Sequence, residues 1–260
     1  MSLFEAELAL AAGRSHTLPL DACEIQFLGF RKAQLANDAQ AAQQHLTQAL
    51  ELSRQAETRD HLLEARIRME WGLVRASLGE HEQAGVDLKW AMDRLEALEA
   101  GHRYHGLAII NLARWHESRD EQGMALALYS SISRQGPHLV EIIALSRYHA
   151  ANLWFEKGHG AAALRHYWVA HHGFKQTELT EQAVDAGLQW LDLALADVDA
   201  DAQTMDEAVE LAAPRSQGES HPKMMAHPDD VQQMVDYLRD KVADGPGLLV
   251  LEDAAQTGQS

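Results

Sequence analysis

Apolar residues recur along this chain at spacings of three and four, which is typical of one buried face of an α-helix. The pattern is clearest over residues 64–98, where two such runs are separated by Gly79. The first run contains Ile67, Trp71, Val74 and Leu78, and the second contains Ala84, Leu88, Ala91 and Leu95. This stretch predicts two antiparallel helices joined by a tight turn.

The second of these runs belongs to a pattern that occurs four times, Ala-x3-Leu/Tyr-x2-Ala/Ile. Its occurrences are Ala42–Leu46–Ala49, Ala84–Leu88–Ala91, Ala125–Tyr129–Ile132 and Ala163–Tyr167–Ala170. Five positions before each leading alanine stand Asn37, Gly79, Asp120 and Gly158. These residue types tolerate the left-handed backbone that ends many helices. We therefore predict four helix–turn–helix units, over about 23–60, 62–100, 104–137 and 139–177.

The two ends of the chain extend this pattern. Residues 1–20 are expected to form an N-terminal cap that contains a short amphipathic helix, and Asp21 is a candidate N-cap for the next helix. Residues 178–213 predict a degenerate fifth unit, so that 1–213 would be one helical domain. A linker at 214–226, a last helix within 227–245 and a disordered tail at 246–260 are expected to follow.

The last predicted helix has an apolar stripe that admits two interpretations. Its members are Val231, Met234, Val235, Leu238 and Val242. In the first interpretation the helix caps the exposed apolar side of the terminal repeat. In the second it is a swapped or self-inhibitory segment that lies in the groove.

The chain resembles the tetratricopeptide (TPR) family over about residues 23–177. The residues that carry the resemblance are Trp71-Gly72, Leu78-Gly79, Ala84, Leu88 and Ala91, their equivalents in the other units, and Pro137. The family implies an all-α, right-handed α-α superhelix, a TPR-like solenoid of antiparallel helix pairs, here with a C-terminal capping helix. The leading alanines at 42, 84, 125 and 163 give a spacing of 38–42 residues, whereas the standard repeat has about 34. This long-repeat variant is similar to helical sensor domains of bacterial regulators and to kinesin light chains.

The resemblance also implies which residues would line a partner-binding groove, because the first helix of each pair faces the concave side in the family. The candidates are Phe27, Arg31, Arg66, Met69, Ile110, Asn111, Arg114, Tyr148, His149, Asn152 and Phe155. Arg31, Arg66 and Arg114 would put three cations on one face of an acidic protein. The family's carboxylate clamp does not carry over, because Leu73 stands where an asparagine is required.

Composition and net charge limit the kinds of partner that this protein is expected to bind, and they also bear on its location in the cell. The formal net charge is −17, which disfavours direct binding to nucleic acid or to an anionic membrane surface. The single Cys23 cannot form an internal disulfide and is expected to be a small buried residue. With no secretory signal and no apolar run of about 20 residues, we expect a cytoplasmic protein.

Recognisable catalytic and metal-binding motifs are missing from the sequence. The 15 histidines include no HExxH motif and no ligand set at helical spacing. Residues 197–201 begin like a calcium loop, but the required glycine and glutamate are replaced by Ala202 and Ala208. We therefore predict no metal, no cofactor and no enzymatic activity, with His166, His171 and His172 as a candidate pH-sensitive patch.

The leading functional hypothesis is a non-enzymatic scaffold whose groove binds another protein or a peptide. The alternative is a regulatory sensor that binds a small peptide or metabolite and acts through a separate DNA-binding or signalling partner. The sequence leaves open the identity of the partner, and it also leaves open self-association into a homodimer.

Overall fold

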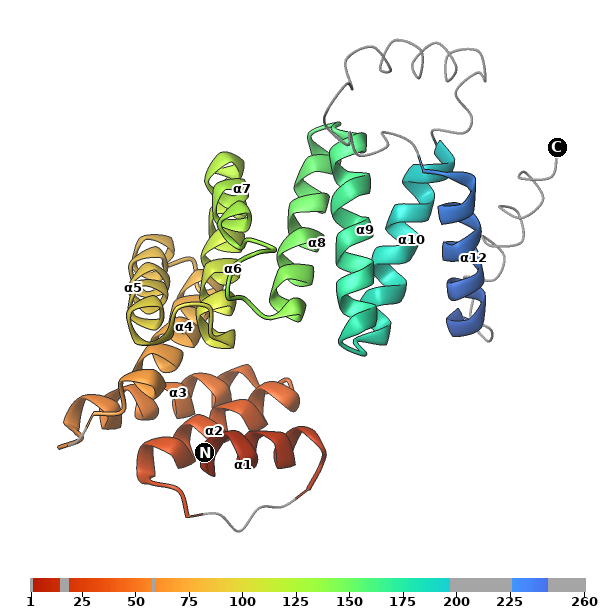
Figure 1. The fold of residues 1–260 in the computed structure, drawn as a ribbon. Helices are drawn as coiled ribbons and strands as arrows, with labels where there is room; N and C mark the ends of the chain where they lie inside the picture. The colour runs from red at the N-terminus through yellow and green to blue at the C-terminus, as the bar shows by residue number, and fades with distance from the viewer. Residues whose placement is uncertain (1, 15–18, 58, 197–225, 243–260) are drawn as a thin grey trace. The chain divides into compact units, whose positions relative to one another are not determined.

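The computed structural model describes residues 2–14, 19–57, 59–196 and 226–242, and every regular element in these ranges is an α-helix (Figure 1). The prediction of an all-α protein built from consecutively packed helices is therefore confirmed. The chain divides into two compact units, residues 1–128 and 129–260, which are described separately. The second part of the predicted fifth unit (197–213), most of the linker at 214–226 and the tail at 246–260 lie outside the described residues.

The first unit is formed by the helices that precede residue 128. They are α1 (Ser2–Ala11), α2 (Ala22–Leu35), α3 (Ala39–Gln55), α4 (His61–Ser77), α5 (His81–Glu99) and α6 (Arg103–Glu117), and α7 (Gln122–Ser131) crosses the boundary between the units. Neighbours in sequence pack on one another: α2 against α3, α3 against α4, α4 against α5 and α5 against α6. The short helix α1 packs against α2.

The turns within the helix pairs have the predicted left-handed backbone. The φ angles are 54° at Asn37, 82° at Gly79, 60° at Asp120 and 74° at Gly158. After each of them, a backbone N–H donates to the carbonyl five residues earlier, as from Glu80 to Arg75 at 2.9 Å. This is the Schellman motif, which satisfies carbonyl groups that the end of the helix leaves free.

The repeated alanine and leucine pattern forms the buried seam of the helix pairs. All twelve of its residues are buried, and Leu46, Leu88 and Tyr129 are completely inaccessible to solvent. Small residues let the paired helices approach closely: a Cβ atom at Gly72 would lie 2.8 Å from the Cγ atom of Leu88. Cys23 is also buried, its thiol donates to the Ala49 carbonyl at 3.4 Å, and burial raises its pKa to about 12.

The second unit contains α8 (Val140–Glu156), α9 (Gly160–Gln176), α10 (Thr180–Ala196) and α12 (Pro228–Val242), which lie side by side in Figure 1. Helices α8 and α9 pack together, α10 packs on α9, and α12 packs on α10. Met234, Val235 and Leu238 of α12 enter the same apolar cluster as Trp190 and Leu191 of α10. The last predicted helix is thus present, and Met234, Val235 and Leu238 of its apolar stripe are buried within this unit.

Candidate functional site

A group of charged side chains in the first unit lies where α1 meets α2 and α4. Asp21 starts α2 with a capping box that pairs it with Glu24, which confirms the predicted N-cap, and Asp60 starts α4 by accepting from the Leu63 amide at 2.9 Å. Within α2, Phe27 and Arg31 stand one turn apart on the same face. Within α4, Arg66 is related in the same way to Glu70.

Two arginines from successive helix pairs converge on one carboxylate. The Arg66 Nη2 atom lies 2.6 and 2.7 Å from the two carboxylate oxygens of Glu7 in α1, and Arg31 Nε donates to Glu7 Oε1 at 3.3 Å. Arg31 also pairs with Glu70 at 3.0 Å. We call these four residues, Glu7, Arg31, Arg66 and Glu70, the Glu7 cluster. Charge-assisted hydrogen bonds of this length are the strong class in proteins.

Aromatic rings hold the two guanidinium groups of the Glu7 cluster in place. The Arg66 Cζ atom lies 4.1 Å from the centroid of the Tyr104 ring and 4.9 Å from that of Phe27. The Arg31 Cζ atom lies 5.4 Å from the Phe27 ring and 5.5 Å from the Phe30 ring. Such cation–π contacts orient an arginine before any anion arrives. Burial raises the pKa of the Tyr104 hydroxyl, although the nearby Arg66 charge partly opposes this shift.

The balance of charge in the Glu7 cluster depends on α1. With Glu7 in place, Arg31 pairs with both Glu7 and Glu70, and Arg66 pairs with Glu7. Without Glu7, Arg31 would keep Glu70, and Arg66 would lose the carboxylate that it contacts. The Arg66 side chain is only 5% exposed, and its Nε atom is buried with no hydrogen-bond partner. Because an unpaired buried cation is costly, this position requires an anion beside it.

A cavity opens beside the cluster, between the last part of α1 and the last part of α2. Its volume is about 320 Å³, and it is lined by Glu7, Leu10, Ala11, Arg31, Gln34 and Leu35. Arg31 Nη1 donates to Gln34 Oε1 at 3.0 Å at the edge of this space. The cavity therefore combines apolar walls with a guanidinium group, a combination suited to an amphipathic ligand that carries an anion.

The structure brings some of the predicted groove residues of the first unit together. Arg31 and Arg66 meet at Glu7 over Phe27, so they are paired with carboxylates rather than forming a run of free cations. Phe27, Met69 and Ile110 are at most 2% exposed and belong to the interior. Asn111 is half-buried and Arg114 is exposed on α6. Whether any of these residues contacts a partner remains a prediction.

The predicted groove residues of the second unit make contacts within that unit. The Tyr148 hydroxyl donates to the Asp185 carboxylate, and Asn152 Oδ1 accepts from the Tyr167 hydroxyl at 2.6 Å. His149 stacks on Tyr129 with the ring centroids 5.7 Å apart. Phe155 is the exception, with 54% of the residue exposed. Whether any of these four residues contacts a partner also stays a prediction.

The sequence analysis did not identify Glu7 and Glu70 of the Glu7 cluster, or Tyr104, on which Arg66 stacks. The available signal was Glu7 itself, because it stands on an otherwise apolar helix face with Leu3, Ala6 and Leu10. A carboxylate in such a place requires a cationic or hydrogen-bonding partner when the helix packs. The periodicity alone does not identify that partner, which lies 59 residues away in sequence.

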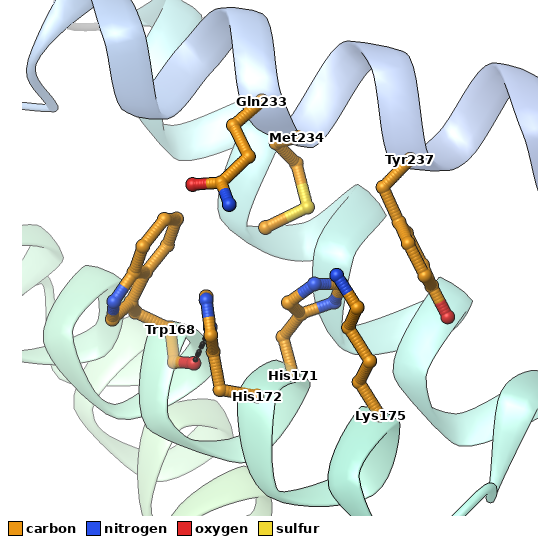
Figure 2. Close-up of a pocket in the computed structure, with 7 residues that line it drawn as sticks. All are labelled: Trp168, His171, His172, Lys175, Gln233, Met234 and Tyr237. Carbon is orange, nitrogen blue, oxygen red and sulfur yellow. Dashed lines mark hydrogen bonds between the residues drawn. The ribbon is translucent and has the colours of Figure 1, made fainter.

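A second pocket lies in the second unit between α9 and α12 (Figure 2). Helix α9 contributes Trp168, His171, His172 and Lys175, and α12 contributes Gln233, Met234 and Tyr237. The cavity volume is about 10 Å³, enough for about one water molecule. Lys175 Nζ lies 4.8 Å from the centroid of the Tyr237 ring, and His171 meets the same ring edge-on. This pocket is a packed junction between two helices rather than a ligand site.

The three histidines of the predicted pH-sensitive patch do not all lie at this pocket. His171 and His172 line the α9–α12 pocket, whereas His166 does not. The Nδ1–H group of His171 donates to the Ala183 carbonyl at 2.8 Å, and that of His172 donates to the Trp168 carbonyl at 3.0 Å (Figure 2). Burial lowers the pKa of both His166 and His171 to about 4. These two rings are consequently neutral at pH 7.

Neither a cluster of metal ligands nor a helix able to span a membrane occurs among the described residues. Within them, no three His, Cys, Asp or Glu side chains come together as metal ligands. None of the described helices combines the length and apolar composition that crossing a bilayer requires.

The described residues define the class of this protein as an all-α protein of consecutively packed helices, compatible with a helical repeat fold. Its site is a carboxylate bound by two arginines, each of which stacks on aromatic rings. No model of a known protein family matches the sequence, and no curated protein is significantly similar to it. The geometry of the two units is therefore the basis for inferring function.

Proposed function

We propose that this protein is a non-enzymatic binding module that holds a segment of another protein on the face of α2, α4 and α6 in its first unit. One observation carries the proposal: Arg31 and Arg66 converge on a single carboxylate over the rings of Phe27 and Tyr104. Arginine and aromatic side chains that are held rigidly in a desolvated site supply much of the energy at protein interfaces.

The finer assignment of the fold belongs to the same proposal. We place the helix pairs in the TPR-like superfamily, in a long-repeat variant with right-handed superhelical winding. The support is the recurrence of the Schellman turn at Asn37, Gly79, Asp120 and Gly158, together with the burial of the repeated alanine pattern. In that family the first helix of each pair presents the binding surface, and here α2 and α4 carry the two arginines of the Glu7 cluster.

The test is affinity capture from a lysate of the native organism, followed by mass spectrometry. Arg31 and Arg114 are replaced by Ala, whereas the nearly buried Arg66 is replaced by Lys so that its positive charge is kept. We expect the combined variant to lose most of the captured partner, and Arg54→Ala, an exposed change on α3, to retain it. Circular dichroism confirms that each chain is folded. Capture that is unchanged in a folded triple variant would overturn the proposal.

A second candidate function, a sensor of small ligands that acts through another protein, is favoured by the cavity beside Arg31. A volume of about 320 Å³ falls in the range of small-molecule sites. Binding would raise the melting temperature by mass action, so a screen of small carboxylates and phosphates by thermal shift tests it. A hit whose stabilisation disappears in Arg31→Ala would support this function over protein binding.

A further inference from the structure

The helix α1 has the features of a docked ligand more than those of a repeat. It has ten residues, it packs at the edge of the unit against α2, and residues 12–21 separate it from that helix. Its inward face is formed by Leu3, Ala6, Glu7 and Leu10, which follow the i, i+3, i+4, i+7 spacing of one helix face. Leu3 and Ala6 are buried, whereas Leu8 on the other side is 51% exposed.

The contacts of this face are divided between an apolar anchor and an anion. Leu3 joins the apolar cluster that contains Phe27 and Phe30. One turn further along, the Glu7 carboxylate receives both Arg31 and Arg66. An apolar helix face set in a groove, with a charge that fixes its register, is a recurrent mode of peptide recognition.

The site is also larger than the helix that occupies it. The cavity of about 320 Å³ lies next to Leu10 and Ala11 of α1 and next to Arg31, Gln34 and Leu35 of α2. A well-packed structural interface fills such a space with side chains. A helix with larger residues at the positions of Leu10 and Ala11 would fill the cavity and still deliver its carboxylate to the arginines.

We infer that α1 is a ligand held in cis, and that the partner binds through an acidic amphipathic helix that displaces α1 and puts its own carboxylate between Arg31 and Arg66. The partner helix would present Leu-x2-Ala-Glu-x2-Leu or a close apolar equivalent on one face. This inference rests on the proposed function, because it names the partner's chemistry at the same site. Charge complementarity identifies the occupant: when α1 leaves, Arg31 keeps only its pair with Glu70, and Arg66 loses the carboxylate that it contacts.

The experiment measures how a labelled peptide binds to the full-length chain in trans. The peptide has the sequence of residues 1–13, MSLFEAELALAAG, and a second peptide carries Glu7→Gln. The wild-type chain is compared with Glu7→Arg, which expels α1 by placing a third cation beside Arg31 and Arg66. Leu3→Asp is a second variant that removes the apolar anchor and leaves every charge of the cluster intact. Asp93→Arg is the matched control, because it makes the same charge change at an exposed position of α5.

Fluorescence anisotropy should show that the Glu-containing peptide binds Glu7→Arg and Leu3→Asp about tenfold more tightly than the wild type or Asp93→Arg. A tethered helix has an effective concentration of about millimolar, and its removal releases the site. The Gln peptide should bind the opened chains about tenfold more weakly than the Glu peptide, since it cannot form charge-assisted bonds. Equal binding to wild-type and opened chains, or equal binding of the two peptides, would overturn the inference.

Three further outcomes are informative: the first tests the commitment to a helix, and the other two separate this inference from the proposed function. If glutarate displaces the peptide at the same concentration as the peptide itself, the site recognises a small anion and the commitment to a helix is wrong. If a partner is captured through the arginines while the peptide binds all chains equally, the function stands and only the role of α1 fails. If the peptide binds as expected and nothing is captured, α1 is a cis ligand and the proposed function fails.

Discussion

Two carboxylates in the first unit each hold two arginines, but they come from different parts of the chain. Glu7 reaches Arg31 and Arg66 from α1, which packs at the edge of the unit. Asp87 reaches Arg68 and Arg75 from α5, the helix that pairs with α4. We call Arg68, Arg75 and Asp87 the Asp87 cluster.

The two clusters have the same local chemistry. In the Asp87 cluster, Arg68 Nη2 lies 3.1 Å from Asp87 Oδ1, and Arg75 pairs with the other oxygen. The Arg68 Cζ atom lies 4.2 Å from the ring centroid of Trp90, much as Arg66 stacks on Tyr104. The Asp87 side chain is 4% exposed and the Glu7 side chain is 15% exposed.

What differs is the way in which the anion can be replaced. Helix α5 is packed along α4 through Leu88, Ala91 and Leu95, all nearly inaccessible, so Asp87 cannot leave without unfolding the pair. In our inference, α1 leaves with Glu7 while α2 to α6 remain packed, and water or another carboxylate then reaches the arginines. Similar ion pairs therefore have different roles: one stabilises the fold, and the other is suited to exchange.

The largest expected effect is that of Asp87→Asn, which removes the anion that belongs to the fold. Arg68 and Arg75 would then be left partly buried beside a neutral amide, and breaking a buried pair costs about 3–5 kcal/mol. We expect urea denaturation, monitored by hydrogen exchange of α4 and α5, to show a decrease of about 3 kcal/mol in the free energy of unfolding. Asp93→Asn, at an exposed ion pair with Lys89, is the control and should have little effect. Equal losses in the two variants would show that burial at Asp87 is not what matters.

The next prediction concerns the pH dependence of stability. Buried His171 in the second unit lowers stability in acid, so its contribution must be known before acid is used to compare Glu7 with Asp87. The folded pKa of His171 is about 4, because its ring is buried, while its ordinary value is 6.5. The unfolded chain therefore takes up a proton below pH 6.5 that the folded unit does not. Stability from this group is complete above pH 6.5, falls as the pH drops to 4, and then levels off, with a total loss of up to about 3 kcal/mol.

Urea unfolding of the second unit at pH 7, 5.5 and 4 measures this loss. In His171→Asn, whose amide can still donate to the Ala183 carbonyl, the pH dependence should be smaller. Some dependence should persist, since burial lowers the pKa of His166 to about 4 as well. An unchanged pH dependence in His171→Asn would mean that other groups cause it.

Much of the fold followed from local patterns in the sequence. The left-handed turns at Asn37 and Gly79 were predictable because residue type and helix end coincide there, and the alanine seam was predictable because its period is helical. Glu178 has a φ of 59° at the start of the connection to α10 and was not predicted. Glutamate has no intrinsic preference for that backbone, but the same Schellman turn ends α9 there, with the Leu179 N–H donating to the Phe174 carbonyl at 3.0 Å.

The candidate site was only half predictable. Arg31 and Arg66 were identified on the expected helices, because the resemblance to the TPR family implies that the first helix of each pair carries the groove positions. Their anion was not identified, because Glu7 and Arg66 are 59 residues apart and meet only when α1 folds back onto α2 and α4. A contact of that kind depends on tertiary structure, for which the only local sign was a carboxylate on an apolar helix face.

A smaller effect is expected for Glu7→Gln, the counterpart of the change at Asp87. Because α1 can undock and let water reach Arg66, we expect a loss of only about 1 kcal/mol, similar to that of a partly exposed ion pair. Hydrogen–deuterium exchange should show faster exchange of the α1 amides, while those of α4 and α5 stay protected. Loss of protection in α4 would contradict the comparison, since Glu7 would then support the fold as Asp87 does.

The smallest effect distinguishes the two arginines that bind Glu7. The Arg31 side chain is 29% exposed and donates one bond of 3.3 Å to Glu7, so a lysine at this position loses little and should cost roughly 0.5 kcal/mol of α1 docking. Arg66 is 5% exposed, contacts both oxygens and stacks on Tyr104, and a lysine cannot reproduce that planar arrangement. Exchange rates of the α1 amides should therefore rise slightly in Arg31→Lys and clearly more in Arg66→Lys. If Arg31→Lys has the larger effect, the more exposed arginine holds the anion, and the expectation that Arg66 is its main partner is wrong.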